Sequence, residues 1–203
     1  MVTAAEPQTF TAQEYLAQEV HSHLRHEYRN SKIIPMTGGT PAHNEITATL
    51  IFLLKLALRE QPYSIFVSDQ RLWIPERNQY TYPDIMVTPR PIALQPGRKD
   101  TVTSPILIAE VLSQSTRAYD RDQKFAAYRR IASFREYLLI EQDQPKVEQY
   151  VKQAEHQWLF TEHQGLETTF SLQSFDSPIP LALSELYEAI NFQPEEPAPV
   201  DPD

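Results

Sequence analysis

Residues 105–112 read Pro105-Ile106-Leu107-Ile108-Ala109-Glu110-Val111-Leu112, an apolar run with one carboxylate inside it. A continuous apolar run of this length is typical of a fully buried β-strand. A charged group in such a strand is costly to remove from water unless a partner compensates its charge. The run therefore predicts a buried strand and, at Glu110, a site that needs a partner.

A second carboxylate and a lysine accompany Glu110. Asp84 begins another strand-like segment, Tyr82-Pro83-Asp84-Ile85-Met86-Val87, and Lys124 follows Glu110 by one short element. Mg²⁺ takes oxygen ligands and is commonly held by one or two protein carboxylates together with substrate phosphate oxygens. We therefore expect Asp84 and Glu110 to bind a divalent cation, with Lys124 nearby, for metal-assisted hydrolysis of a phosphodiester.

Each of these residues also has a structural interpretation. Asp84 can cap a turn at a strand edge. Lys124 can form an ordinary helix-surface ion pair with Asp120, four residues before it. Tyr128, one turn beyond Lys124, either fills the core or lines the site. Glu110 is the hardest to explain without a ligand, because charge is rarely left unpaired in an apolar run.

The patterning along the chain predicts an α/β fold with a mixed β-sheet core flanked by helices. A capping box at Thr11 and Glu14 opens the first helix, and Thr40-Pro41 opens the second. Helices are expected at residues 11–21, 40–59, 120–131 and 184–190. Strands are expected at residues 32–36, 63–67, 70–74, 84–87, 106–111, 136–140, 146–151 and 158–161. The third helix should bury Phe125, Tyr128 and Ala132 on one side.

Composition limits the classes of protein that the chain can represent. With 203 residues, 41% of them hydrophobic, residues 1–192 should form one domain, whereas the acidic, proline-rich segment 193–203 should be disordered. The chain has no cysteine, which excludes disulfides and thiolate chemistry, and its 4 glycines exclude a phosphate loop. No signal-peptide pattern or long apolar run is present, so a cytoplasmic protein without membrane contact is expected.

The charge balance is acidic, with a net charge of −9 and a pI of about 5.2. This argues against a protein that coats nucleic acid nonspecifically, because such binding depends on cationic surfaces. A local basic groove can coexist with an acidic total. The candidates for such a groove, which are otherwise ordinary surface charges, are Arg90, Arg98, Lys99, Arg117, Arg121, Arg129 and Arg130.

The same residues resemble a known family. Pro83-Asp84, Glu110 and Lys124 resemble the PD-(D/E)XK nuclease signature, and segment 110–124 is similar to the Uma-two family of restriction endonucleases. Leu112 stands where the parent signature has its lysine. In the Uma-two pattern the lysine lies on the following helix, which is where Lys124 is expected. The likeness extends upstream through segment 27–44 and covers roughly residues 10–150.

The resemblance implies a restriction-endonuclease-like fold and a Mg²⁺- or Mn²⁺-dependent endonuclease that cleaves DNA, with a homodimer as a further expectation. It implies that Asp84 and Glu110 hold the metal, with the carbonyl of Val111 as a third ligand. It implies that Lys124 positions the attacking water or helps to deprotonate it, and that it offsets charge developing on the phosphate. The accessory candidates are Glu45 or Glu27 as a further acidic group, His43 as either a phosphate contact or a backbone-bonded residue, Asp69, and Tyr128.

Two other functions fit the same residues. The chain could be a non-catalytic module that keeps the nuclease fold for binding, because fold does not guarantee activity. It could also be a nuclease or toxin directed at RNA, with the same catalytic residues and a different groove. No helix-turn-helix or zinc-finger pattern is visible, so specificity would come from loops of the domain or from a partner chain.

Overall fold

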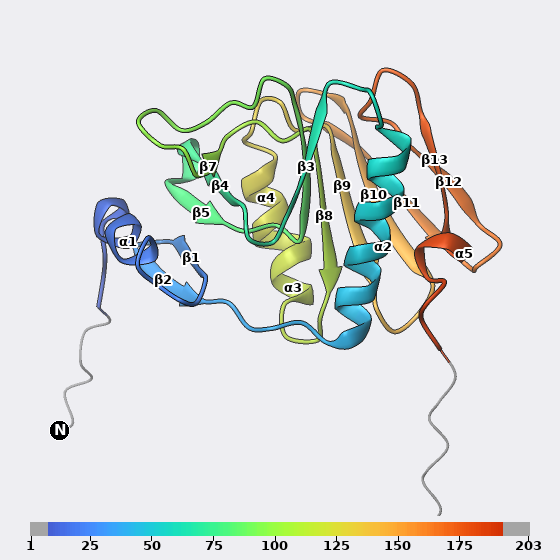
Figure 1. The fold of residues 1–203 in the computed structure, drawn as a ribbon, viewed down its shortest axis with the longest axis horizontal. Helices are drawn as coiled ribbons and strands as arrows, with labels where there is room; N and C mark the ends of the chain where they lie inside the picture. Colours follow the sequence, from blue (N-terminus) through green and yellow to red (C-terminus); the bar gives the residue numbers. More distant parts are fainter. Residues whose placement is uncertain (1–7, 193–203) are drawn as a thin grey trace, which may run out of the picture.

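The computed structural model describes residues 8–192 of the chain (Figure 1). Segment 193–203, for which disorder is predicted, lies outside the described residues, as do residues 1–7. Within the described part, no helix is long and apolar enough to cross a membrane.

A six-stranded mixed sheet, in the order β11-β10-β9-β8-β6-β3, forms the centre of the fold. Its strands are β3 (Tyr63–Val67), β6 (Ile85–Pro89), β8 (Leu107–Leu112), β9 (Glu136–Glu141), β10 (Lys146–Ala154) and β11 (Gln157–Gln164). Strand β8 is parallel to β9 and antiparallel to β6. The apolar run is therefore an interior strand, and every residue of β8 is buried as predicted.

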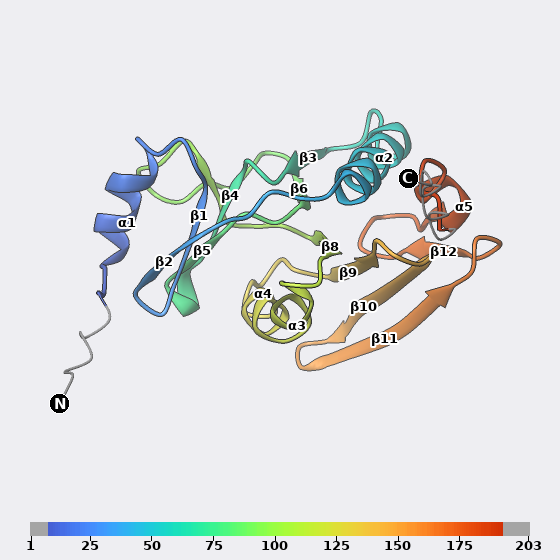
Figure 2. The same cartoon turned by 90° about the horizontal axis from the view of Figure 1, so that it is seen from below.

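Helices cover both faces of this sheet (Figure 2). One face carries α2 (Pro41–Ala57), α5 (Leu183–Leu186) and the hairpin of β12 (Thr169–Leu172) with β13 (Ile179–Ala182). The other face carries α3 (Arg117–Tyr119), the π-helical turn η2 (Asp120–Lys124) and α4 (Phe125–Tyr128). In β8, Leu107 and Ala109 pack toward α2, and Ile108 and Leu112 pack toward α4. Because side chains alternate along a strand, Glu110 faces the helical segment that carries Lys124.

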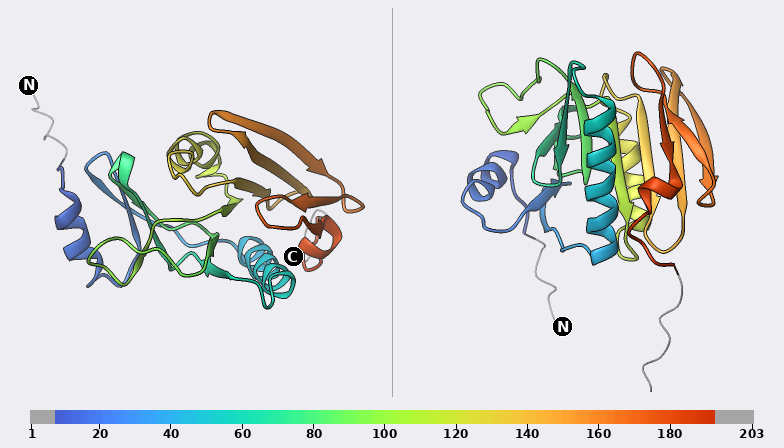
Figure 3. Two further views of the ribbon diagram at one scale, coloured as in Figure 1. Left: turned by 90° about the horizontal axis from the view of Figure 1, so that it is seen from above. Right: turned by 45° about the vertical axis from the view of Figure 1, so that its right-hand side comes forward.

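A second, five-stranded sheet, in the order β2-β1-β5-β4-β7, lies beside the first (Figure 3). It consists of β1 (His26–Arg29), β2 (Lys32–Pro35), β4 (Arg71–Ile74), β5 (Gln79–Thr81) and β7 (Thr101–Val102), with the 3₁₀ turn η1 (Pro75–Arg77) between β4 and β5. Helix α1 (Ala12–Glu19) packs on it through Tyr15, whose ring centroid is 5.3 Å from that of Tyr28. The sequence does not predict β1, β5 or β7, because β5 and β7 have only three and two residues and β1, which reads His-Glu-Tyr-Arg, shows no apolar run.

The N-terminal ends of the two longer helices are as predicted. Thr11 and Glu14 form the capping box of α1, and Thr40 caps α2 by accepting the N–H of His43. The predicted apolar face of α2 is buried at Ile46, Leu50 and Leu54.

The prediction of a helix over 120–131 is wrong in its bounds. Helical structure begins at Arg117, because the Ser113 hydroxyl accepts the N–H of Thr116 and turns the chain directly after β8. It ends at Tyr128, and Ala132, predicted to be buried, is exposed beyond it. Ile131 is buried in the core only because the chain turns back there, with its N–H donating to the carbonyl of Tyr128.

The last predicted helix is also shorter than expected. It ends at Leu186 rather than at residue 190, after which the Tyr187 hydroxyl donates to the backbone carbonyls of Glu141 and Lys146. These bonds tie the end of α5 to the turn between β9 and β10.

Candidate active site

The antiparallel register of β6 and β8 places Asp84 beside Glu110. Ile85 pairs with Ala109, so the next pair outward joins Asp84 to Glu110. The N–H of Asp84 donates to Oε2 of Glu110 over 3.3 Å, and Oδ2 of Asp84 accepts the N–H of Val111 over 2.9 Å. The side chains of Asp84 and Glu110 are only 15% and 2% exposed. The two carboxylates predicted as metal ligands are therefore buried neighbours.

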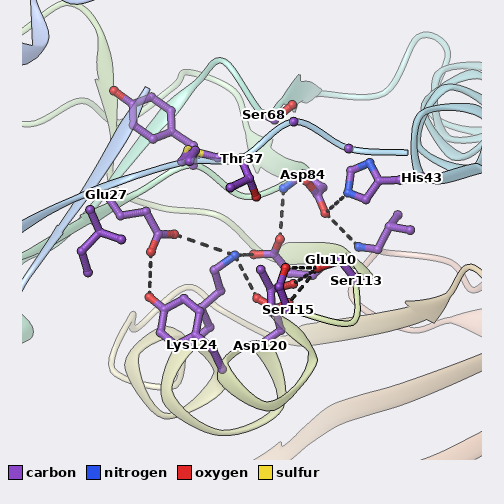
Figure 4. Close-up of a pocket in the computed structure, with 18 of the residues that line it drawn as sticks. Glu27, Thr37, His43, Ser68, Asp84, Glu110, Ser113, Ser115, Asp120 and Lys124 are labelled. Atoms are coloured by element: carbon purple, nitrogen blue, oxygen red, sulfur yellow. Dashed lines mark hydrogen bonds and ion pairs between the residues drawn. The ribbon is translucent and has the colours of Figure 1, made fainter. Parts of the chain in front are cut away.

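Lys124 reaches the same place from the opposite layer (Figure 4). Its Nζ lies 3.1 Å from Oε1 of Glu110 and 3.0 Å from Oδ1 of Asp120. The hydroxyl of Tyr128 donates to Oε1 of Glu110 over 2.7 Å. Asp120 and Lys124 span the π-helical turn, a local widening of the helix that is frequent at functional sites, and both are buried. The ion pair between them is therefore internal, and its interpretation as a surface pair is wrong.

Strand β1 contributes Glu27. Its Oε1 lies 3.8 Å from Nζ of Lys124 and accepts the hydroxyl of Thr81, while its Oε2 accepts the hydroxyl of Tyr119 over 2.9 Å. Of the two glutamates that compete for the accessory position, Glu27 lies at the site, whereas Glu45 is exposed on α2 and does not line the cavity.

His43 approaches from the first turn of α2. Its Nε2 lies 3.1 Å from Oδ2 of Asp84, and its Nδ1 is buried without a hydrogen-bond partner among the described residues. The hydrogen bond with Asp84 raises the pKa of His43 although burial acts against it. The imidazole thus contacts a predicted metal ligand rather than nearby backbone.

Two groups of predicted residues lie elsewhere. Asp69 is exposed and forms an ion pair with Arg25 at 2.7 Å, while its neighbour Ser68 lines the cavity. Among the candidates for a basic groove, Arg117 and Arg121 both pair with Glu141 at 2.7 Å. None of the seven groove candidates is among the described residues that line the cavity.

The converging side chains line a cavity of about 360 Å³. A second cavity of about 240 Å³ lies next to it and is lined by Arg29, Arg77 and Gln79. Arg29 and Tyr119 line both cavities, and the Arg29 guanidinium carbon lies 3.7 Å from the centroid of the Tyr119 ring. The two cavities are therefore adjacent, with Tyr119 and Arg29 between them.

Burial and mutual repulsion control the charges at the site. Burial raises the pKa of Glu110 to about 8, and the charges of Asp84 and Asp120 add to this although Lys124 opposes it. Burial also disfavours the charged form of Asp84, but the hydrogen bond and charge of His43 and the charge of Lys124 bring the pKa of Asp84 below its usual value. The surrounding carboxylates hold the pKa of Lys124 well above its usual value in spite of its burial.

The donor set fits a divalent cation. Four carboxyl groups line the cavity, those of Glu27, Asp84, Glu110 and Asp120. The permanently cationic side chains that line it are Lys124 and Arg29. Within residues 8–192, no group of three or more His, Cys, Asp or Glu side chains is already placed to hold a metal. The Asp84–Glu110 pair nevertheless supplies the one or two carboxylates with which proteins usually hold Mg²⁺. Burial raises the pKa of Glu110, the charges of Asp84 and Asp120 raise it further, and a bound cation would oppose both effects by favouring the ionised carboxylate.

Sequence reasoning missed three side chains of the site. Asp120 enters it as a surface partner of Lys124 and, with Tyr119, as part of the family pattern, whereas Arg29 does not enter it at all. One signal for Asp120 was available: Asp120, Lys124 and Tyr128 recur every four residues, which places them on one side of a helix. No comparable signal exists for Arg29, because its strand is too short to be predicted.

The chain matches one protein family over most of its length. The Uma2 family, described as "Putative restriction endonuclease", matches residues 12–183. "Uncharacterized protein sll1609" of Synechocystis sp. is 43% identical over 165 residues, which cover 81% of this chain and 93% of the relative. "Uncharacterized protein slr1290" of the same organism is 35% identical over 155 residues, which cover 75% of this chain and 80% of the relative.

A solved structure shares the fold. It is described as a "putative nuclease belonging to DUF820" from Anabaena variabilis, and it superposes with a TM-score of 0.70 at 19% identity over 90% of this chain and 98% of that one. This match confirms the predicted fold, a mixed sheet flanked by helices. With the family match over residues 12–183, the chain belongs to the Uma2 family of restriction-endonuclease-like proteins.

Proposed function

We propose that the protein is a Mg²⁺- or Mn²⁺-dependent endonuclease that hydrolyses phosphodiester bonds of DNA. The observation that carries the proposal is the convergence of Asp84, Glu110 and Lys124 on one cavity, with Nζ of Lys124 3.1 Å from Glu110. Two carboxyl groups and an ammonium held together with little access to water are costly to a fold, and chemistry at phosphate explains them better than stability does.

Asp84 and Glu110 would hold the metal. When bound, a divalent cation supplies charge neutralisation at the phosphate and lowers the pKa of a water molecule. His43 would hold the Asp84 carboxylate in position through its 3.1 Å contact, and Tyr128 would do the same for Glu110 through its 2.7 Å hydrogen bond. Because burial raises the pKa of Tyr128 well above its usual value, its hydroxyl remains a donor at neutral pH.

Lys124 would act as a fixed positive charge. In the metal-free protein its carboxylate neighbours keep its pKa raised, so we assign it the role of a protonated hydrogen-bond donor rather than of a general base. A preorganised ammonium in a buried site can orient the attacking water by donating to it, and it stabilises charge that develops on the phosphate.

The second cavity gives the substrate strand a place to continue. Arg29 and Arg77 line it together with Asp122, but neither arginine forms an ion pair within residues 8–192, and Arg29 donates to the amide oxygen of Gln123 over 2.8 Å. Guanidinium groups that are free of carboxylates are suited to bidentate contact with phosphate. We therefore place the phosphate next to the scissile one at Arg29, in place of the predicted basic groove.

Metal binding should depend on Asp84. Mg²⁺ or Ca²⁺ binds only the folded site and should raise the melting temperature by mass action. Asp84→Asn keeps an oxygen to accept the N–H of Val111 but removes the charge, so the metal-induced rise should disappear. Asp69→Asn, at an exposed carboxylate outside the cavity, should keep the rise. An equal rise in the Asp84 variant would remove Asp84 from the site.

The metal-free protein should become less stable as pH rises. The folded state holds the Glu110 proton up to about pH 8, whereas the unfolded chain releases it near the usual carboxyl pKa. The folded state therefore binds more protons, and its extra stability, complete at low pH, is lost between about pH 5 and pH 8. In Glu110→Gln this part of the fall should vanish, as measured by urea denaturation in chelator. The control variant Glu155→Gln, at an exposed carboxylate, should retain the wild-type pH dependence of stability. If Glu110→Gln also retained it, the pKa of Glu110 would be an ordinary one and the prediction would be wrong.

Cleavage should depend on the charge of Lys124. Lys124→Met removes the ammonium while keeping most of the side-chain volume, and it should lower the single-turnover rate by ~10² or more. The metal-induced rise in melting temperature should persist, because a cation beside the metal site weakens rather than supports metal binding. Lys99→Met, at an exposed lysine outside the cavity, should cleave at the wild-type rate. A Lys124→Met enzyme with full activity would favour the non-catalytic or purely structural role for this lysine.

Binding should depend on Arg29 through salt. With Ca²⁺ in place of Mg²⁺ to prevent cleavage, Arg29→Gln should reduce the slope of log binding constant against log salt by about 1, the loss of one phosphate contact. Arg98→Gln, whose guanidinium already pairs with Asp100, should leave the slope unchanged. Binding in Ca²⁺ and cleavage in Mg²⁺ would be compared for duplex DNA, single-stranded DNA and RNA probes of one sequence. Tighter binding and faster cleavage of the RNA probe would show that RNA, not DNA, is the substrate.

A further inference from the structure

The outer side of α2 carries a stripe of exposed side chains that no other element covers. It consists of Glu45, Ala48, Phe52, Leu56 and Arg59, which is just beyond the helix. At 100° per residue the four members within the helix fall within an arc of about 80°, on the side opposite its buried residues, and Arg59 follows directly after the helix end. Phe52 and Leu56 are 64% and 60% exposed, and with Leu24 they are the most exposed large hydrophobic residues of the described part.

A single exposed apolar residue needs no explanation, but the regular spacing of the residues in this stripe does. The spacings between its members are three, four, four and three residues, so the stripe reads the same in both directions from Phe52. The residues at matching positions are complementary. Small Ala48 matches large Leu56, and acidic Glu45 matches basic Arg59.

Complementarity about a central residue is what two antiparallel copies of one helix require. In such a pair, residues equally far before and after the centre lie opposite each other, because a twofold axis passes through the middle. Phe52 would meet Phe52, Leu56 of each copy would fill the space above Ala48 of the other, and Glu45 would pair with Arg59. Neither Glu45 nor Arg59 has an ion-pair partner within the described residues.

We propose that the protein forms a symmetric homodimer through the outer face of α2, with Phe52 on the twofold axis. Antiparallel helices with interlocking large and small side chains pack at 8–10 Å between axes. One helix pair buries less surface than a permanent dimer interface does, so the dissociation constant should lie in the micromolar range.

This arrangement places the two candidate active sites at opposite ends of the helix pair. His43, which contacts Asp84, lies nine residues before Phe52 in each copy. With a rise of 1.5 Å per residue, the two His43 residues would be about 27 Å apart along the pair. The dimer is independent of the proposed function, because the stripe contains none of the residues assigned to catalysis.

A charge exchange tests the pairing. Sedimentation velocity of the wild-type protein over a range of concentrations should show a monomer–dimer equilibrium. Glu45→Arg and Arg59→Glu should each weaken the dimer at least tenfold, since each places like charges opposite each other, and the double variant should restore it. A monomeric wild type, or a double variant no better than the single ones, would overturn the proposal.

A cross-link tests the axis. The chain contains no cysteine, so Phe52→Cys introduces one thiol per copy, which on the axis can meet its counterpart within disulfide reach. Mild oxidation should convert this variant to a covalent dimer rapidly. Leu159→Cys, at a similarly exposed position on β11, should cross-link only slowly by collision. Equal rates for the two variants contradict the interface, and circular dichroism of each variant checks that it is folded.

Discussion

The ammonium of Lys124 is the interaction on which the rest of the site depends. It lies among Glu110, Asp120 and Glu27, at distances of 3.1, 3.0 and 3.8 Å, with almost no access to water. Removing these ions from water costs several kcal/mol per ion, and only good mutual geometry recovers this cost. The three carboxylates come from β8, the π-helical turn and β1, so this charge cluster also joins the two sheets and the helical layer. A fold selected for stability alone would fill this space with apolar side chains.

The sequence predicts the strands that carry Asp84 and Glu110, because apolar runs and their bounding turns are local signals. It cannot predict their register, although a slip of one residue would turn one carboxylate to the opposite face of the sheet. The pairing of Ile85 with Ala109, which places the two carboxylates side by side, is a long-range property of the folded sheet.

The sequence predictions that the structure corrects or leaves undecided also depend on long-range contacts. Propensity predicts a regular helix over residues 120–131, but the packing of Asp120 and Lys124 toward the cavity goes with a π-helical turn that no local pattern signals. The choice between Glu27 and Glu45 needs β1, a strand of four residues, and β1 is recognisable only once it pairs with β5. No local pattern distinguishes a groove arginine from a paired one, whereas in the fold Arg117 and Arg121 both pair with Glu141 of β9.

The charge cluster also determines how the proposed chemistry would be divided. In the metal-free protein the carboxylate neighbours of Lys124 raise its pKa and favour the protonated form, which can donate hydrogen bonds and stabilise negative charge. Glu110, with its raised pKa, exchanges a proton near neutral pH when no metal is present. Binding of a cation between Asp84 and Glu110 would displace that proton, because both carboxylates must then be ionised. In the proposed mechanism a bound metal would supply the activation of the nucleophile, and Lys124 would contribute a positive charge that is already in place before the phosphate arrives.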